Sequence, residues 1–248
     1  NNPVLELPDG SRQRLTFTDS GSPKLVSPQR WRGECMNTGS GGIRISSPEG
    51  IQYEMTQYVI EGGSLYPTHA YYTTKIIDPN GNYANITYEA GSHEIKGVTA
   101  NDGRQIAFSY TGSAASRRIT YIVAEGQTYK YDYTAVTGVL DAFQLASVTR
   151  PDTLKTTYDY NGNLNLQPGR YRMKQLTNIR GGVTQYNYAY VYFDTKSNPT
   201  TRTEVIQKKT TSNGGTWTFS YNAGGVGQYD VTTVAGPSGT TTYRHIGP

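Results

Sequence analysis

The histidines are the first residues to test for chemistry, because an imidazole can act as a general base or as a metal ligand near neutral pH. The chain has three, His69, His93 and His245, which lie far apart in the sequence. None of them forms the H-x-x-x-H spacing that places two imidazoles on one helical face. We therefore predict structural positions for all three, no catalytic, cofactor-binding or metal-binding residue, and no cofactor.

Other reactive side chains also lack the context that chemistry needs. The serines lie in turns without the G-x-S-x-G sequence of a nucleophile elbow, and the run Gly39-Ser40-Gly41-Gly42 lacks the Lys-Ser/Thr of a phosphate loop. Asp132 and Asp159 recur at strand positions, where we expect ion pairing or solvation. Cys35 is the single cysteine, which excludes an internal disulfide and a Cys-based zinc site; we expect it to be buried and inert. The sequence predicts a protein that is not an enzyme, and a hydrolase ranks well below the alternatives.

The composition predicts an all-β protein with a thin aliphatic core. Of 248 residues, 22 are Tyr and 28 are Gly, whereas the hydrophobic set reaches only 35%. Disordered chains are poor in aromatic and β-branched residues, and this one is rich in Tyr, Thr, Val and Ile. The composition therefore argues against disorder and against a helical bundle.

Charge and hydropathy restrict the partners. The formal net charge is +4, and the densest basic pairs are Arg117-Arg118 and Lys208-Lys209. A nucleic-acid interface concentrates such charge on one face, so we expect these pairs in solvated loops and strand faces, and no nucleic-acid partner. No apolar run approaches the ~20 residues of a membrane span, and residues 1–3 show no signal-peptide pattern. Because the chain opens on a strand-like segment, we expect a fragment or a matured product of a larger protein.

Short turn sequences recur along the chain. Pro presets the backbone at the second turn position, and Gly or Asn accepts the positive φ that follows. The turns with proline are Pro8-Asp9-Gly10, Pro48-Glu49-Gly50, Pro79-Asn80-Gly81, Pro237-Ser238-Gly239 and the degenerate Pro151-Asp152-Thr153. The variants without it are Asp102-Gly103, Glu125-Gly126, Gly181-Gly182 and Asn213-Gly214.

A similar strand follows each turn. Its aromatic or aliphatic residues lie mostly three, five and seven places after the turn glycine, counted from Gly181 in the Gly181-Gly182 turn and from Thr153 in the degenerate turn. Side chains alternate along a strand, so these residues share one face while polar residues take the other. The sets are Leu15 and Phe17; Tyr53 and Met55; Ala84, Ile86 and Tyr88; Ile106, Phe108 and Tyr110; Tyr129, Tyr131 and Tyr133; Thr156, Tyr158 and Tyr160; Thr184, Tyr186 and Tyr188; and Trp217, Phe219 and Tyr221, with His245 in the last Tyr place.

Each unit is therefore predicted to be one β-hairpin, and a lone hairpin is marginal in water. Burial of an inward side chain contributes roughly 1.5–3 kcal/mol, whereas ordering each residue costs about 1–2 kcal/mol. Stacking on neighbouring units is required, so the sequence predicts a continuous, twisted antiparallel sheet. We place an irregular β segment with two PDG-like hairpins at residues 1–64 and an array of about seven units at 65–248. The segment 18–47 matches no copy well.

This pattern resembles the YD repeat of Rhs-type proteins, a family that includes bacterial polymorphic toxins, cocoon components of insecticidal Tc toxins, wall-associated proteins and animal teneurins. The sharpest match is Tyr158-Asp159-Tyr160-Asn161-Gly162-Asn163-Leu164, which fits YD-x-x-G-x-L. Tyr131-Asp132 keeps the pair without the glycine, and Asp78-Pro79-Asn80-Gly81 fits the D-P-x-G turn. The resemblance covers about residues 66–248. It implies a sheet that coils into a hollow shell, which in toxin members encloses a C-terminal effector.

The functional expectation follows from that resemblance. The chain is expected to be a non-catalytic structural region of a secreted or cell-surface bacterial protein, with further repeats and a C-terminal effector of the same polypeptide as partners. Seven to nine hairpins would form part of a shell wall. No effector-like segment follows Tyr243, and Asp78 is predicted to serve a turn rather than self-cleavage.

The alternative is an extracellular adhesive or glycan-binding module. Its Tyr-rich face would contact sugars, or its edge hairpins would pair with copies of itself into filaments. The shell hypothesis predicts that Tyr131, Tyr158, Tyr186 and Phe219 are mostly buried, whereas rings on an open surface would favour glycan binding.

Overall fold

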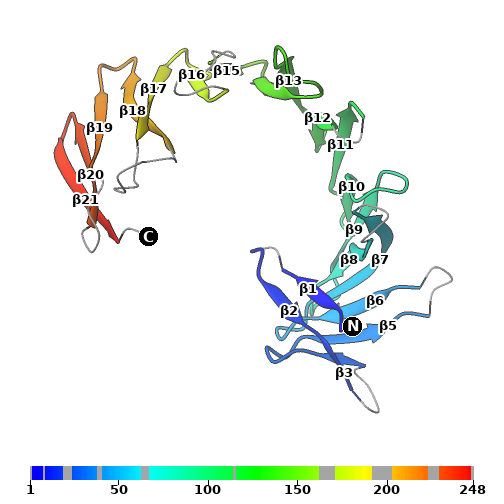
Figure 1. Cartoon of the computed structure of the whole chain (residues 1–248). Coiled ribbons are helices and arrows are strands. Elements are labelled where there is room, and N and C mark those ends of the chain that lie inside the picture. Colours follow the sequence, from blue (N-terminus) through cyan, green and yellow to red (C-terminus); the bar gives the residue numbers. More distant parts are fainter. Residues whose placement is uncertain are drawn as a thin grey trace. The chain divides into compact units, whose positions relative to one another are not determined.

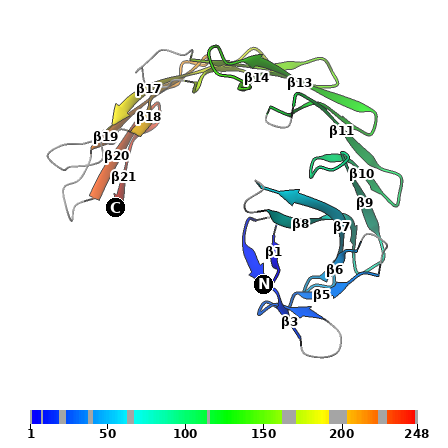
Figure 2. The same cartoon turned by 45° about the vertical axis from the view of Figure 1, so that its right-hand side comes forward.

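The computed structural model describes residues 2–7, 9–18, 24–37, 41–62, 67–113, 116–161, 171–191, 203–222 and 229–246. Over these residues the regular structure consists of strands and contains no helix. The strands are antiparallel, follow one another in chain order and form a long open sheet (Figures 1 and 2), with a separate two-stranded sheet at the start. The predicted all-β class and the hairpin-by-hairpin growth of the sheet are confirmed.

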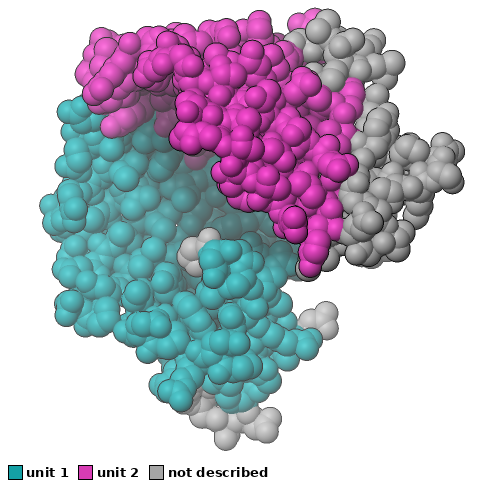
Figure 3. Space-filling model, turned by 90° about the vertical axis from the view of Figure 1, so that its left-hand side faces the viewer, with its two compact units in different colours: residues 1–109, 122–127 teal, residues 110–121, 128–248 magenta. Residues whose placement is uncertain are grey.

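The chain divides into two compact units, residues 1–109 with 122–127 and residues 110–121 with 128–248 (Figure 3). The first unit contains β1 (Val4–Glu6), β2 (Arg12–Arg14), β3 (Thr16–Phe17), β4 (Leu25–Val26), β5 (Arg32–Cys35), β6 (Ile43–Ser46), β7 (Gln52–Glu61), β8 (Thr68–Ile77), β9 (Tyr83–Tyr88) and β10 (Ile95–Ala100). Three strands have residues in both units: β11 (Gln105–Thr111), β12 (Arg118–Ala124) and β13 (Gln127–Ala135). The second unit continues with β14 (Phe143–Thr149), β15 (Lys155–Tyr160), β16 (Met173–Thr177), β17 (Val183–Val191), β18 (Thr203–Thr211), β19 (Thr216–Asn222), β20 (Tyr229–Gly236) and β21 (Gly239–Ile246).

Most of the predicted turns share one hydrogen-bond pattern. In the turn after β8, the Asp78 N–H donates to the Asn82 carbonyl (2.9 Å) and the Gly81 N–H donates to the Asp78 carbonyl (3.1 Å). Gly81 has φ 86°, the left-handed conformation that closes a three-residue hairpin loop. The same two bonds occur in the turns at 7–11, 27–31, 47–51, 100–104, 150–154, 178–182 and 211–215.

Two of these turns have a side chain where the others have glycine. Arg30 and Thr153 both have φ 66°, and their backbone N–H groups make the same bond as Gly81. The degenerate turn at 151–153 was predicted. The turn at 27–31 was not, so the expectation that 18–47 matches no copy of the repeat is wrong at this point: Ser27-Pro28-Gln29-Arg30 is a repeat turn without its glycine.

Two other turns belong to a different class. Glu125 and Gly126 both have positive φ (51° and 73°), which is the two-residue type I′ hairpin turn. At the last hairpin, Gly236 pairs directly with Gly239, leaving Pro237 and Ser238 as a two-residue loop. Both segments are turns, as predicted, but their two-residue loops differ from the three-residue loops of the other predicted turns.

A β-bulge and a tyrosine recur together in the hairpins. Between β15 and β16, Asp159 pairs with Gln175 but Tyr160 pairs with Met173, so Lys174 is an extra residue. Across the next turn, the Tyr188 hydroxyl donates to the Met173 carbonyl (2.8 Å). Tyr221 donates in the same way to Ile206 (2.7 Å), beside the bulge at 207, and Tyr88 donates to Thr73 (2.5 Å), beside the bulge at 74. Each tyrosine lies 15 residues after its acceptor.

Strand alternation follows the predicted register. In β9, β15 and β19 the predicted inward residues are half-buried and the intervening residues are exposed. Ile106 and Tyr129, the residues nearest their turns, are instead 40% and 36% exposed, and Phe17 is 57% exposed. All three residues lie within three positions of an end of their strand, where neighbouring strands cover a side chain less completely.

Among the described residues, the buried hydrophobic side chains all belong to the first unit. Leu5, Leu15, Leu25 and Ile45 form one cluster, and Trp31, Tyr53 and Met55 are partly buried against it. Gly33 is needed in this cluster because a Cβ there would approach Ile45 and Leu25 at 3.0 Å. The β1–β2 hairpin supplies Leu5 and the adjacent Leu15, so a second layer covers the strands here.

The four rings chosen to test burial, Tyr131, Tyr158, Tyr186 and Phe219, are half-buried. Each exposes only the smaller part of its surface, as the shell hypothesis predicts, and none of the four lies on an open surface. Cys35 is exposed rather than buried, because it is the last residue of β5, beyond the cluster.

The predicted boundary between residues 64 and 65 stays a prediction, since residues 63–66 lie outside the described part. The same holds for Gly39 and Ser40 of the glycine-rich run and for Gly162-Asn163-Leu164 of the sharpest YD motif.

Candidate functional site

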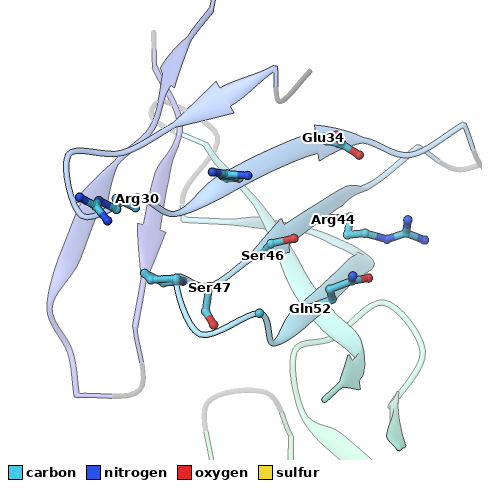
Figure 4. A pocket seen from close by; sticks show the side chains of 9 residues that line it. Arg30, Glu34, Arg44, Ser46, Ser47 and Gln52 are labelled. Carbon is cyan, nitrogen blue, oxygen red and sulfur yellow. The ribbon is translucent and has the colours of Figure 1, made fainter. Parts of the chain in front are cut away.

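A groove of about 600 Å³ lies in the first unit (Figure 4). It lies over the polar face of β5, β6 and β7 and the two turns beside them. Figure 4 shows Arg30 and Ser47 on the turns, and Glu34, Arg44, Ser46 and Gln52 on the strands. The remaining lining residues are Arg32, Pro48 and Gly50.

Sheet register builds the floor of this groove from two rows. Arg32 pairs with Ser46, which pairs with Gln52, so these three side chains form one row across the strands. Glu34, Arg44 and Glu54 form the next row. Gly33, Ile45 and Tyr53 lie between the rows in sequence and therefore face the opposite side, toward the leucine cluster. The core on one side thus fixes the polar rows on the other.

The charges of the groove are unequal. Three arginines and one glutamate line it, and Arg44 donates to the Glu54 carboxylate at 2.7 Å. Within the described part of the chain, no carboxylate lies within ion-pair distance of Arg30 or Arg32. Two guanidinium groups are therefore available to a ligand, beside the hydroxyl of Ser46 and the amide of Gln52.

The structure gives His93 a carboxylate neighbour that sequence reasoning missed. His93 Nδ1 lies 3.3 Å from Glu61 Oε1, and the Tyr72 hydroxyl donates to the same oxygen. Partial burial, with a further contribution from Glu61, raises the pKa of Tyr72 to about 12, so the phenol stays protonated and keeps donating. Tyr72 also stacks on His93 with ring centroids 5.6 Å apart. The cluster joins β7, β8 and the turn after β9.

His69 also packs against an aromatic ring. It stacks on Tyr58 with centroids 5.9 Å apart, and the Tyr58 hydroxyl and His69 Nδ1 form a hydrogen bond. His69 and Tyr58 lie on paired strands, β8 and β7. The proximity of His69 to β7 follows from that pairing, which the sequence would have shown only if the hairpin 52–77 had been aligned as one unit. His93 instead reaches Glu61 of β7 from the turn after β9.

The YD carboxylates pair with lysines. Asp132 contacts Lys130 at 2.9 Å and Lys155 at 3.9 Å, and it accepts a hydrogen bond from the buried Ser147 hydroxyl (2.9 Å). Lys130, followed by Ser147, lowers the pKa of Asp132 below its usual range. Asp159 lies 3.4 Å from Lys174. Both acids therefore form the ion pairs that the sequence predicts.

The basic pairs contact aromatic rings. Arg118 lies over the Phe143 ring at 3.5 Å, Arg117 over Tyr110 at 5.4 Å, and Lys209 over Trp217 at 4.9 Å. Arg117 and Lys208 are exposed, as predicted, whereas Arg118 and Lys209 are half-buried beside their rings, because aromatic neighbours on the sheet attract cations.

A smaller hollow of about 210 Å³ lies in the second unit. Its rings are Tyr158, Tyr160 and Tyr171, with Asp159 and Asn161 beside them. Unlike the groove in the first unit, this hollow is lined by aromatic rings and by no Lys or Arg side chain.

Within the described ranges, no group of three or more His, Cys, Asp or Glu side chains is arranged to hold a metal ion. No helix there has the length and apolar character to cross a membrane.

Comparison with known proteins gives no match, either to a protein-family model or to a curated protein.

Proposed function

We propose that the chain is a non-catalytic structural repeat region of a secreted or cell-surface bacterial protein of the Rhs/YD-repeat type. In that role its sheet is a segment of wall that encloses or presents another part of the same polypeptide, such as further repeats and a C-terminal effector.

The recurring hairpin device carries this proposal. The same turn, bulge and tyrosine occur at Thr73 and Tyr88 in the first unit, and at 173 with 188 and 206 with 221 in the second. In each case the hydroxyl binds a carbonyl beside a bulge, so it fixes the twist that the bulge introduces. Because this turn, bulge and tyrosine recur at the same position of the hairpin, they set the curvature of the sheet in each unit, as expected for a shell wall.

The half-buried aromatic face supports the enclosing role. In β15 and β19 the rings alternate with exposed polar residues, yet in the described part of the second unit no hydrophobic side chain is fully buried. Apolar surface that stays partly in water is stabilised when another segment covers it, by about 25 cal/mol per Å². A polypeptide held against this face would supply that cover.

Hydroxyl-radical footprinting tests the proposal. Oxidation of Tyr131, Tyr158, Tyr186 and Phe219 is measured in the 248-residue chain alone and in the complete product of its gene. We expect oxidation of these rings to fall several-fold in the complete product, while oxidation of Tyr83, 37% exposed in the first unit, stays unchanged. Equal oxidation of the four rings in both samples would contradict the enclosing role.

A further inference from the structure

We propose that the groove over β5, β6 and β7 binds an acidic oligosaccharide, one that carries carboxylates and free hydroxyls on the same chain of sugars. The site is separate from the aromatic face and does not depend on the proposed wall function.

Arg32 is the central donor. It lies in the row with Ser46 and Gln52, which places a planar guanidinium beside a hydroxyl and an amide. A guanidinium binds a carboxylate through two parallel hydrogen bonds. Sugar hydroxyls both donate and accept, and the Ser46 and Gln52 side chains can do the same.

Arg30 adds a second donor at an energetic disadvantage. Its φ of 66° lies in the left-handed region, where side chains are strained and where most equivalent turns of this protein have glycine. Strain of this kind is typical of functional positions. At this turn the side chain in the glycine position is an arginine that lines the groove.

The mixture of charges selects among anions. Glu34 also lines the groove, and Arg44 is already paired with Glu54. A dense polyanion would be repelled by Glu34, whereas a sugar hydroxyl would donate to its carboxylate. No aromatic ring lines the groove, so stacking on a neutral sugar is absent there. An anion with spaced carboxylates and intervening hydroxyls fits best, and a peptide of acidic residues alone has no hydroxyl donors at neutral pH.

The test is calorimetric titration of the 248-residue chain with oligogalacturonate. Arg32→Ala should lower its affinity at least tenfold. Arg30→Gly should lower the affinity several-fold and raise the Tm, since glycine relieves the backbone strain.

Thr153→Gly is the matched control for strain. Thr153 has the same φ in the same turn class but lies in the second unit. Its replacement should raise the Tm similarly and leave the affinity unchanged. Tyr158→Ala, in the smaller hollow, should also leave the affinity unchanged.

Three outcomes would overturn the proposal. The first is wild-type affinity in the folded variant Arg30→Gly/Arg32→Ala, with folding checked by circular dichroism. The second is equal or tighter binding of poly-L-glutamate, which would indicate an acidic peptide. The third is equal binding of neutral dextran. Selective binding of oligogalacturonate that weakens with added salt and with both arginine variants would support it.

Discussion

The two units of this protein use one hairpin design but stabilise it in different ways. In the first unit, Leu5, Leu15, Leu25 and Ile45 are at most 7% exposed, because the β1–β2 hairpin provides a second layer. In the second unit, the described side chain with the least exposure is that of Ser147 at 2%, and the aromatic rings remain half-buried. A layered core and lateral stacking of neighbours are thus alternative means of stabilising the same repeat.

The largest expected effect is at the layered core. Leu25→Ala should lower the free energy of unfolding by about 2–5 kcal/mol, because Leu25 is 1% exposed and its removal leaves a cavity. Urea unfolding measures the change. Leu25→Met, which nearly conserves volume, should cost less than about 1.5 kcal/mol. Similar losses for both variants would contradict a tightly packed cluster.

The second expected effect is at the laterally stacked face. Tyr158→Ala should cost about 2 kcal/mol, roughly half of what a fully buried ring loses, since the ring is half-buried opposite Leu176. The same urea unfolding measures it, with Tyr158→Phe as the control that keeps the ring. A loss larger than that of Leu25→Ala would reverse the comparison between the units.

The third expected effect isolates the tyrosine hydroxyl. Tyr221→Phe should cost about 1 kcal/mol, because it leaves the Ile206 carbonyl without its donor beside the bulge. Tyr229, 55% exposed, serves as the comparison, and Tyr229→Phe should change the free energy of unfolding by less than about 0.5 kcal/mol. If the two variants were equally stable, the hydroxyl would contribute nothing to the repeat.

The smallest expected effect concerns alkaline pH. The pKa of Tyr72 is raised to about 12, mainly by burial, so the folded state disfavours its ionisation. Its contribution to stability is complete below the unfolded pKa of about 10 and is lost as the pH rises from there toward 12. Over about two pH units, from about 9.5 to about 11.5, the Tm of the wild type should therefore fall more steeply than that of Tyr72→Phe. Parallel curves would contradict this role.

Much of the local structure could be predicted because it depends on neighbouring residues. Pro79-Asn80-Gly81 predicts its turn from the φ preferences of three residues, and the alternation in β15 follows from strand geometry. The turn at 27–31 was missed because Arg30 occupies a position where glycine was expected. The bulge at Lys174 could not be predicted either, since it depends on how two strands align.

The candidate groove could not be predicted from the sequence either, because it also depends on how the strands align. Arg30, Arg32 and Arg44 lie among polar residues whose local pattern resembles any solvated strand. They come together because β5 pairs with β6 and because Gly33 and Ile45 turn the opposite face toward the leucines.

The sequence by itself determined the all-β class, most hairpin positions and the face on which each repeat places its tyrosines, because turn chemistry and period-two alternation are local. Only the tertiary structure decided which face is covered and which arginines share a groove. Burial depends on a second layer, and the groove depends on strand register. Both therefore depend on contacts between segments, which the local sequence does not specify.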